Sequence, residues 1–325
     1  GHQRARRSAK MTLEHGYRRL TETTDMRNLE LKDIFAGNCY HICTNGQESP
    51  VIMKCDDDYK VALNYLALLG WKYGIGILAY CLMSNHVHIL IICRNREEAQ
   101  RFIRSFKRLY STYLLNRYGQ SDTLRGIKDS ITLIDSVQYL RNCIAYILRN
   151  GLSAGICMRI EDYPWSSHSC YFNTDNSGQY RKVEDLGERE KRSMFKTRQN
   201  LKGCPYLIDH TGKILDRSFV RHDLVEKAFN NSGKFFLLTL GICNDAQMEY
   251  EMACRPLIGV NDGELIRIAE RTASERFKGR SIPDLSAKER CSMIKTLYFN
   301  NKTTIPQLSR ILGLPRALVT QILGT

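Results

Sequence analysis

The stretch Ile75–Ile92 reads IGILAYCLMSNHVHILII. Its two ends, Ile75–Cys81 and Val87–Ile92, are apolar runs of strand length, and the Met83–Asn85 segment between them suits a tight turn. The pattern predicts two antiparallel strands joined as a hairpin, around which the neighbouring elements must pack. Two histidines, at positions 86 and 88, interrupt the apolar pattern.

His86 and His88 are separated by one residue, so an extended strand places both side chains on the same face. A histidine in an apolar strand commonly serves as a core or interface residue. Two neutral imidazoles side by side also form half of a divalent metal site, provided that carboxylate or amide oxygens complete the shell. The pair alone leaves both interpretations open.

The segments around this hairpin predict an α+β fold. A short strand is expected at Asn38–Thr44, a helix from about Tyr59 to Gly70, a long helix from about Arg96 to Tyr118, and a further helix from Asp135 to Asn150, which Gly151 would end. Residues 120–130 read as a loop. This order is typical of a ferredoxin-like, split βαβ antiparallel sheet with helices on one side.

Composition points to a protein that binds a polyanion. The chain has 325 residues and a formal net charge of +14, with ordinary apolar and charged fractions. Nucleic acid is the leading partner for such a charge, because no apolar run is long enough to span a membrane. The twelve cysteines include no CxxC pair, which disfavours zinc-ribbon and thioredoxin-like functions. A reducing cytoplasmic location is expected.

The chain divides by composition into four parts. Residues 1–36 form a basic N-terminal arm, 37–175 contain the predicted α+β domain, 176–200 are polar and charged and suit a linker, and 201–325 are mostly helical. Residues 304–323 (TIPQLSRILGLPRALVTQIL) have the pattern of a helix-turn-helix. Its second helix would expose Arg316, Thr320 and Gln321 to DNA. A helical hairpin that packs and binds nothing would give the same pattern.

The long helix after the hairpin is basic. Residues 94–128 contain nine Lys or Arg against three Asp or Glu, and one helix face carries Arg101, Arg104, Lys107 and Arg108. We expect these four side chains to bind DNA phosphates. A charge run of this kind is also common on a face that is merely solvated.

A further ligand and a nucleophile are offered by the helix that ends near Gly151. Tyr146 and Asn150 are four residues apart and lie on one helix face. Packed against the histidine face of the sheet, this helix would add an amide oxygen to a metal site and a phenol beside it. Tyr139, two turns earlier, could share that face, but it has no oxygen ligand four residues later.

Several stretches resemble a known family, the HUH single-tyrosine transposases, and within it the REP-associated tyrosine transposases. They lie in order over about residues 37–172: YHI at Tyr40, DDD before the first helix, SNHVHILI, FKRLYSTYLLNRYG, YILRN, and DYPWSS at Asp162–Ser167. The family's His-hydrophobic-His pair corresponds to His86 and His88. Its Tyr-x-x-x-Gln or Tyr-x-x-x-Asn helix corresponds to Tyr146 and Asn150.

This resemblance implies cleavage and rejoining of single-stranded or hairpin DNA. Tyr146 would be the nucleophile of a 5′-phosphotyrosine intermediate, and His86, His88 and Asn150 would bind Mg²⁺ or Mn²⁺. Some relatives carry C-terminal modules, so flanking duplex is a further expected partner, and a homodimer is possible. The alternative is a DNA-binding regulator that has lost catalysis. An RNA-binding module is disfavoured because the HVHILI strand lacks an aromatic platform.

Overall fold

The computed structural model describes residues 29–35, 38–46, 49–119, 124–173, 178–254, 262–301, 303 and 305–324. Its centre is an antiparallel sheet in the order β2-β3-β1-β4. The strands are β1 (Cys39–Thr44), β2 (Gly76–Leu82), β3 (Val87–Ile92) and β4 (Asp129–Leu133). With helices between β1 and β2 and between β3 and β4, this is the ferredoxin-like topology, and the predicted fold class is confirmed.

The β2–β3 hairpin forms where the sequence predicts it. Leu82 pairs with Val87, and the Met83 N–H donates to the His86 carbonyl at 2.8 Å, which leaves Ser84 and Asn85 as the loop. The Ser84 carbonyl accepts the backbone N–H groups of Ile52 and Met53 at 2.8 and 2.9 Å. The turn before the two histidines is therefore held from outside the hairpin as well.

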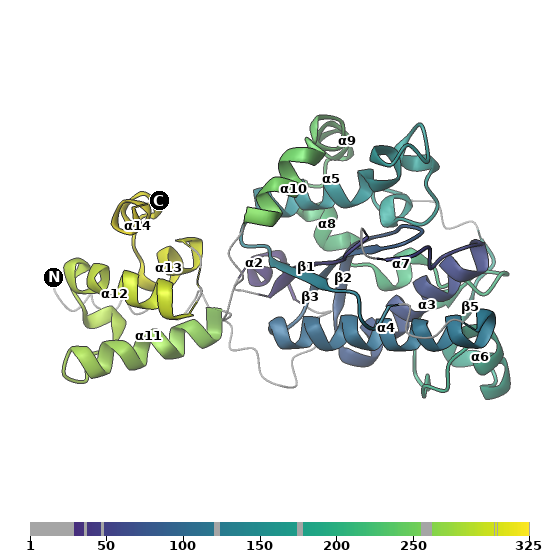
Figure 1. The fold of residues 1–325 in the computed structure, drawn as a ribbon, viewed down its shortest axis with the longest axis horizontal. Helices are drawn as coiled ribbons and strands as arrows, with labels where there is room; N and C mark the ends of the chain where they lie inside the picture. The colour runs from purple at the N-terminus through teal and green to yellow at the C-terminus, as the bar shows by residue number, and fades with distance from the viewer. Residues whose placement is uncertain are drawn as a thin grey trace.

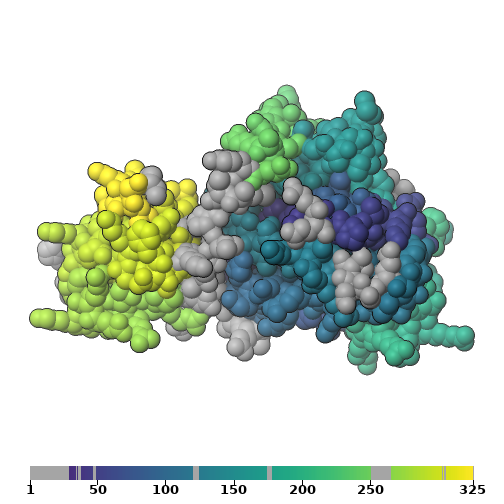
Figure 2. Space-filling model, viewed as in Figure 1, coloured from purple at the N-terminus to yellow at the C-terminus, as the bar shows by residue number. Residues whose placement is uncertain are grey.

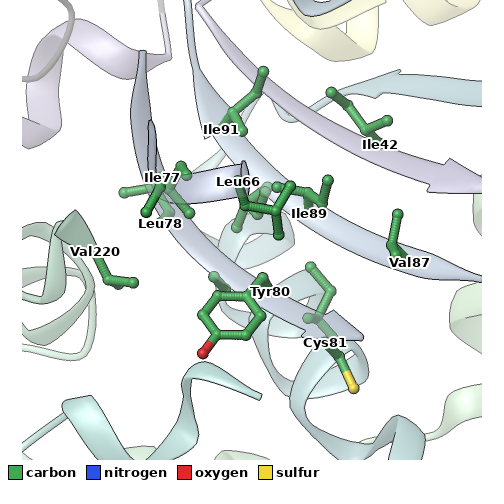
Figure 3. Close-up of a cluster of buried hydrophobic side chains, with 14 of the residues drawn as sticks. Ile42, Leu66, Ile77, Leu78, Tyr80, Cys81, Val87, Ile89, Ile91 and Val220 are labelled. Atoms are coloured by element: carbon green, nitrogen blue, oxygen red, sulfur yellow. The ribbon is translucent and has the colours of Figure 1, made fainter. Parts of the chain in front are cut away.

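Helices cover both faces of the sheet. α3 (Asp56–Tyr73) and α4 (Arg96–Tyr118) lie below it in Figure 1, and α5 (Val137–Ser153) lies above it. Figure 3 shows Leu66 of α3 in one apolar cluster with Ile42 and Ile89 of the sheet. The expected placement of helices on one side holds for α3 and α4. α5 adds a second layer because the chain crosses over after β4.

β4 and the end of α5 differ from the sequence-based prediction. Residues 120–130 were expected to be a loop, but Asp129–Leu133 pairs with β1 and buries Ile131 and Leu133 on alternate positions. α5 continues through Gly151 to Ser153. Gly151 is needed for close packing rather than as a cap, since a Cβ there would lie 2.7 Å from Cγ of Tyr163.

We expect Gly151→Ala to destabilise the protein by about 1–3 kcal/mol, because the added methyl group would displace the Tyr163 ring. The Tyr163 hydroxyl donates to the Leu82 carbonyl at 2.6 Å, so the disturbance would reach β2. Urea denaturation measures the effect. Gly241→Ala, also in a helix but with no atom within 4 Å of its new Cβ, is the control and should not destabilise. Equal stability of the two variants would contradict this account.

The outer edge of β2 is covered by later parts of the chain. The Leu82 N–H donates to the Trp165 carbonyl at 2.9 Å, and the Tyr80 N–H donates to Oγ of Ser167 at 3.0 Å. Farther along the strand, the Arg221 N–H donates to the Ile77 carbonyl at 2.7 Å. The DYPWSS stretch thus supplies hydrogen-bond partners to an edge strand.

Residues 178–254 pack on the sheet domain. Their elements are β5 (Arg181–Lys182), α6 (Glu188–Phe195), β6 (Leu207–Ile208), α7 (Asp216–Phe219), α8 (His222–Ala228), α9 (Gly233–Ile242) and α10 (Asp245–Cys254), with a short 3-10 turn at Val183–Asp185. Outside this range, further 3-10 turns lie at Ile160–Asp162, Ser167–Cys170 and Ile282–Asp284. The predicted linker, 176–200, differs from this arrangement. Val183, Leu186 and Phe195 are buried in the main core, so the described part of that segment is folded.

Residues 262–324 form a separate helical core. Its helices are α11 (Asp262–Arg276), α12 (Ala287–Asn301), α13 (Ile305–Leu312) and α14 (Arg316–Leu323). Leu308, Ile311, Leu312 and Val319 are buried among these helices, as the pattern at 304–323 predicts. Figure 2 shows this part as a yellow-green body beside the rest. This separate helical core therefore begins after α10, whereas the sequence predicts a C-terminal helical domain from residue 201.

Of the predicted N-terminal arm, residues 1–28 and 36 lie outside the described residues. The remainder contains the short helix α2 (Leu31–Ile34), and Leu29 before it is buried. Nη2 of Arg221 donates to the Leu29 carbonyl at 3.1 Å, which ties this part of the arm to the α8 region. Among the helices of the described ranges, none combines the length and apolar character that a membrane crossing requires.

Candidate active site

The structure brings His86, His88, Tyr146 and Asn150 together on the α5 face of the sheet. The Tyr146 ring meets His88 edge to face with centroids 5.4 Å apart, and the His86 and His88 rings are 5.0 Å apart in a similar arrangement. Tyr146 is buried at 8% exposure. Tyr139 is buried too, but the ring contacts place Tyr146 against His88 and against His41 of β1.

The proton of His86 is assigned by its neighbours. Nδ2 of Asn85 donates to the Gly46 carbonyl at 2.8 Å, so Oδ1 of Asn85 is left as an acceptor. That oxygen lies 2.7 Å from Nδ1 of His86, which must therefore carry the hydrogen. The lone pair of His86 is consequently on Nε2. Gly46 itself permits this approach, because a Cβ there would lie 2.8 Å from Nδ1 of His86.

Asn150 presents an oxygen to the two imidazoles. Its Nδ2 donates to the carbonyls of Tyr146 and Ile147 at 2.9 and 3.3 Å. Oδ1 is then the acceptor that remains, and the Asn150 side chain opposes the lowering of the pKa of both His86 and His88. The last turns of α5 thus orient this amide by their own backbone.

Two residues that sequence reasoning missed belong to this site. His41 of β1 lies with Nε2 3.2 Å from Nδ1 of His88, and Sγ of Cys43 lies 3.8 Å from Nε2 of His88. Antiparallel pairing places Cys43 directly opposite His88, so His41 falls on the same face two residues away. The alternation in NCYHICT carried this signal, but it required the strand register.

Glu249 of α10 is a further residue that was not predicted. The Tyr146 hydroxyl donates to Oε1 of Glu249 at 3.5 Å. α10 is fixed on α5 by Nε of Arg149, which bonds both carboxylate oxygens of Asp245 at 3.0 and 3.2 Å, and by the Ser153 hydroxyl, which donates to the same carboxylate. No local pattern links residue 249 to residue 146 in the sequence.

Burial keeps the histidines neutral. It lowers the pKa of His41 to about 4 and holds the pKa of His88 well below its ordinary value, with His41 and His86 adding to the effect on His88. The pKa of His86 is also lowered by burial, which Asn150 partly opposes. The pKa of Tyr146 is raised, mainly by burial and then by Cys43 and Glu249. Neutral imidazoles are the form that binds metal ions.

The predicted basic face of α4 is divided. Arg101, Arg104 and Arg108 are exposed and line a groove of about 620 Å³ with Tyr73, Glu97 and Ser105. Lys107 was expected beside them, but it is 4% exposed, and its Nζ bonds Asp129 at 3.0 and 3.2 Å and also the Ile127 carbonyl. At this position of the helix the side chain points toward β4. Lys107 is therefore part of a buried ion pair and does not belong to the exposed basic face.

The α4 groove and the Tyr146 cluster belong to opposite faces of the sheet (Figure 1). In the C-terminal helices, Arg316 and Gln321 are exposed and Thr320 is half-buried. The turn before α14 is held by Nη1 of Arg290, which donates to the Leu312 carbonyl at 2.8 Å, and by the Ser309 hydroxyl, which donates to the Leu314 carbonyl at 2.7 Å.

Residues 36–128 match the family described as "Transposase IS200 like". Over this segment the chain is similar to the IS200-like transposases, in agreement with the resemblance seen in the sequence. The match contains β1 to α4 and both histidines, and it ends before Tyr146 and Asn150.

A solved structure of a REP-associated tyrosine transposase bound to a REP hairpin is similar over 41% of this chain and 77% of its own, with 15% sequence identity and a TM-score of 0.34. This likeness is too low to transfer any property to the present chain. No curated protein matches the chain.

Proposed function

We propose that this chain cleaves and rejoins single-stranded DNA, with Tyr146 as the nucleophile. The observation that carries the proposal is the packing of the Tyr146 ring against His88, with Asn150 one helical turn away. His86, His88, Tyr146 and Asn150 all come from one chain. This supports an active site that a single copy can assemble, so a homodimer would contain two such sites.

His86, His88 and Asn150 would hold a divalent ion, Mg²⁺ or Mn²⁺. The donors fit such an ion, because Nδ1 of each histidine is occupied by a neighbour and Oδ1 of Asn150 is the amide's remaining acceptor. Within the described ranges, no group of three or more His, Cys, Asp or Glu is arranged to hold a metal. Other ligands would therefore be oxygens of water or DNA. When bound, the ion would polarise the scissile phosphate.

The chemistry assigned to Tyr146 is a phosphoryl transfer in which one phosphoester bond replaces another. The phenol oxygen attacks phosphorus, a tyrosine–phosphate ester forms at the 5′ side, and the bond to the 3′ oxygen breaks to give a 3′-OH. Glu249 is the carboxylate in contact with the phenol and would receive its proton, which finally resides on the leaving oxygen. Attack by another 3′-OH reverses the step and joins strands.

The arginines of the α4 groove would bind DNA at a distance from the cleavage point. Arg101, Arg104 and Arg108 are spaced along one helix face and are exposed. Because this groove is on the other face of the sheet, a bound strand there cannot be the one that contacts Tyr146 directly. We assign it to another part of the same DNA.

The C-terminal helices support a second candidate function, binding of duplex DNA. α13 and α14 meet at a turn through Gly313, whose φ is +61°, and α14 exposes Arg316 and Gln321. In an active enzyme this module would hold flanking duplex. In a protein that had lost catalysis, duplex binding by this module would be the remaining activity.

The proposal is tested by incubating the full chain with labelled hairpin DNA, carrying single-stranded flanks, and Mn²⁺. We expect an adduct that survives denaturing electrophoresis and disappears in His86→Ala, since that variant loses a donor without touching the arginine groove. DNA affinity, measured by fluorescence anisotropy, should stay close to wild type. An adduct of undiminished yield in His86→Ala would overturn the metal assignment. DNA binding without any adduct in wild type would favour the regulator.

A further inference from the structure

We propose that His41 is a positioning residue for the candidate metal site, which selects the tautomer of His88 that can bind a cation. The inference rests on the proposed function, because it assigns a role to His41 only if His88 is a metal ligand. It concerns a residue on a different strand from the His86–His88 pair.

His41 and His88 form a direct hydrogen bond between their rings. Nε2 of His41 lies 3.2 Å from Nδ1 of His88. The two rings are parallel within 2° and their centroids are 5.4 Å apart, which is the separation of rings set edge to edge. One hydrogen is shared across this contact, and either ring can supply it.

The two possible tautomers have opposite consequences for His88. If His88 donates from Nδ1, its lone pair is on Nε2 and faces the site. If His41 donates instead, His88 carries its hydrogen on Nε2 and cannot bind a cation there. His86 has no such freedom, because Oδ1 of Asn85 can only accept. The direction of the His41–His88 hydrogen bond therefore decides whether His88 can act as a metal ligand.

The surroundings of His41 show that this contact has a cost. His41 is 1% exposed, and among the described residues Nδ1 has no hydrogen-bond partner. When His41 accepts from His88, its own hydrogen must be on that unpartnered Nδ1. Buried polar atoms are normally satisfied, and one that is left without a partner is expected where another requirement prevails. Binding of a cation to Nε2 of His88 would be that requirement.

Cys43 offers an acceptor to the other tautomer of His88, which carries its hydrogen on Nε2. Its Sγ donates to the Thr44 carbonyl at 3.3 Å, so the sulfur can only accept from His88, whose Nε2 is 3.8 Å away. In the absence of a cation, a hydrogen on Nε2 of His88 therefore has a weak acceptor. Cation binding at Nε2 of His88 would displace this hydrogen. The hydrogen shared between the rings would then belong to Nδ1 of His88, Nδ1 of His41 would take up the displaced one, and His41 would become the acceptor.

Two substitutions separate positioning from packing. His41→Phe keeps a ring of similar size and removes the acceptor, whereas His41→Gln places an amide oxygen near the former Nε2. We expect the Kd for Mn²⁺, measured on DNA-free protein by electron paramagnetic resonance, to rise about 10- to 100-fold in His41→Phe. His41→Gln should retain most of the affinity. His168→Phe removes another buried, unpartnered imidazole nitrogen and should leave Mn²⁺ binding unchanged.

The tautomer is read directly by ¹⁵N NMR of the wild-type imidazoles with and without Mg²⁺. We expect His88 to carry its hydrogen on Nδ1 in the Mg²⁺-saturated protein. Unchanged Mn²⁺ affinity in folded His41→Phe would overturn the inference. If that variant does not fold, loss of affinity in folded His41→Gln would overturn it. Equal Mn²⁺ binding by wild type and His86→Ala would instead refute the metal site itself.

Discussion

Replacing Tyr146 with phenylalanine is expected to abolish the covalent DNA adduct and to reduce strand cleavage by about 10³-fold or more, since it removes the proposed nucleophile, whose ring packs against His88. The ring contacts with His41 and His88 need no hydroxyl, and that hydroxyl has one described partner, Glu249 at 3.5 Å. The variant should therefore fold normally. Denaturing electrophoresis of labelled hairpin DNA, incubated with Mn²⁺, measures the adduct.

Tyr139→Phe is the matched control for this experiment. It removes a second buried phenol from the same helix, two turns earlier, and should leave the adduct unchanged. A Tyr146→Phe protein that still forms a full yield of adduct would exclude Tyr146 as the nucleophile. Loss of the adduct in Tyr139→Phe alone would move the nucleophile to that position.

Replacing Lys107 with methionine should lower the free energy of unfolding by about 3–5 kcal/mol, which is the usual cost of leaving one member of a buried ion pair alone. The Lys107 side chain is 6% exposed and that of Asp129 is 14% exposed. The substitution keeps most of the volume but leaves the Asp129 carboxylate without its partner. Burial already raises the pKa of Asp129, and Lys107 is the main influence that opposes this. Urea denaturation measures the loss.

Arg108→Ala is the control for Lys107, because it removes the neighbouring charge from an exposed position. Its stability should remain within about 0.5 kcal/mol of wild type. Its affinity for single-stranded DNA should fall, and the slope of log affinity against log salt should decrease by about one. A stable Lys107→Met protein with weakened DNA binding would contradict the buried ion pair and would indicate that Lys107 contacts DNA.

Periodicity predicted the elements that are buried on one side and bounded by clear turns. β3 and α4 have the expected bounds, and β1, β2 and α3 are displaced by a few residues at most. β4 was missed because Asp129 and Ser130 begin it, so its pattern could not be distinguished from a polar loop. Gly151 was misread for a different reason, since its small size serves contact with Tyr163.

The sequence predicted those site residues that lie close together within one strand or one helix. The pairs His86–His88 and Tyr146–Asn150 are each set by one strand or one helix, so a sequence pattern contains them. His41 depends on the register between β1 and β3, and Glu249 depends on how α10 docks on α5. Lys107 shows the opposite error, because charge alone cannot tell a surface lysine from one that reaches a buried carboxylate.

Coverage of the β2 edge restricts how two copies of this chain could associate. A dimer built by β-augmentation needs free backbone groups on an outer strand. Residues 165–167 and 221 already occupy those groups on β2. Continuation of the sheet into a second subunit is therefore confined to the β4 side.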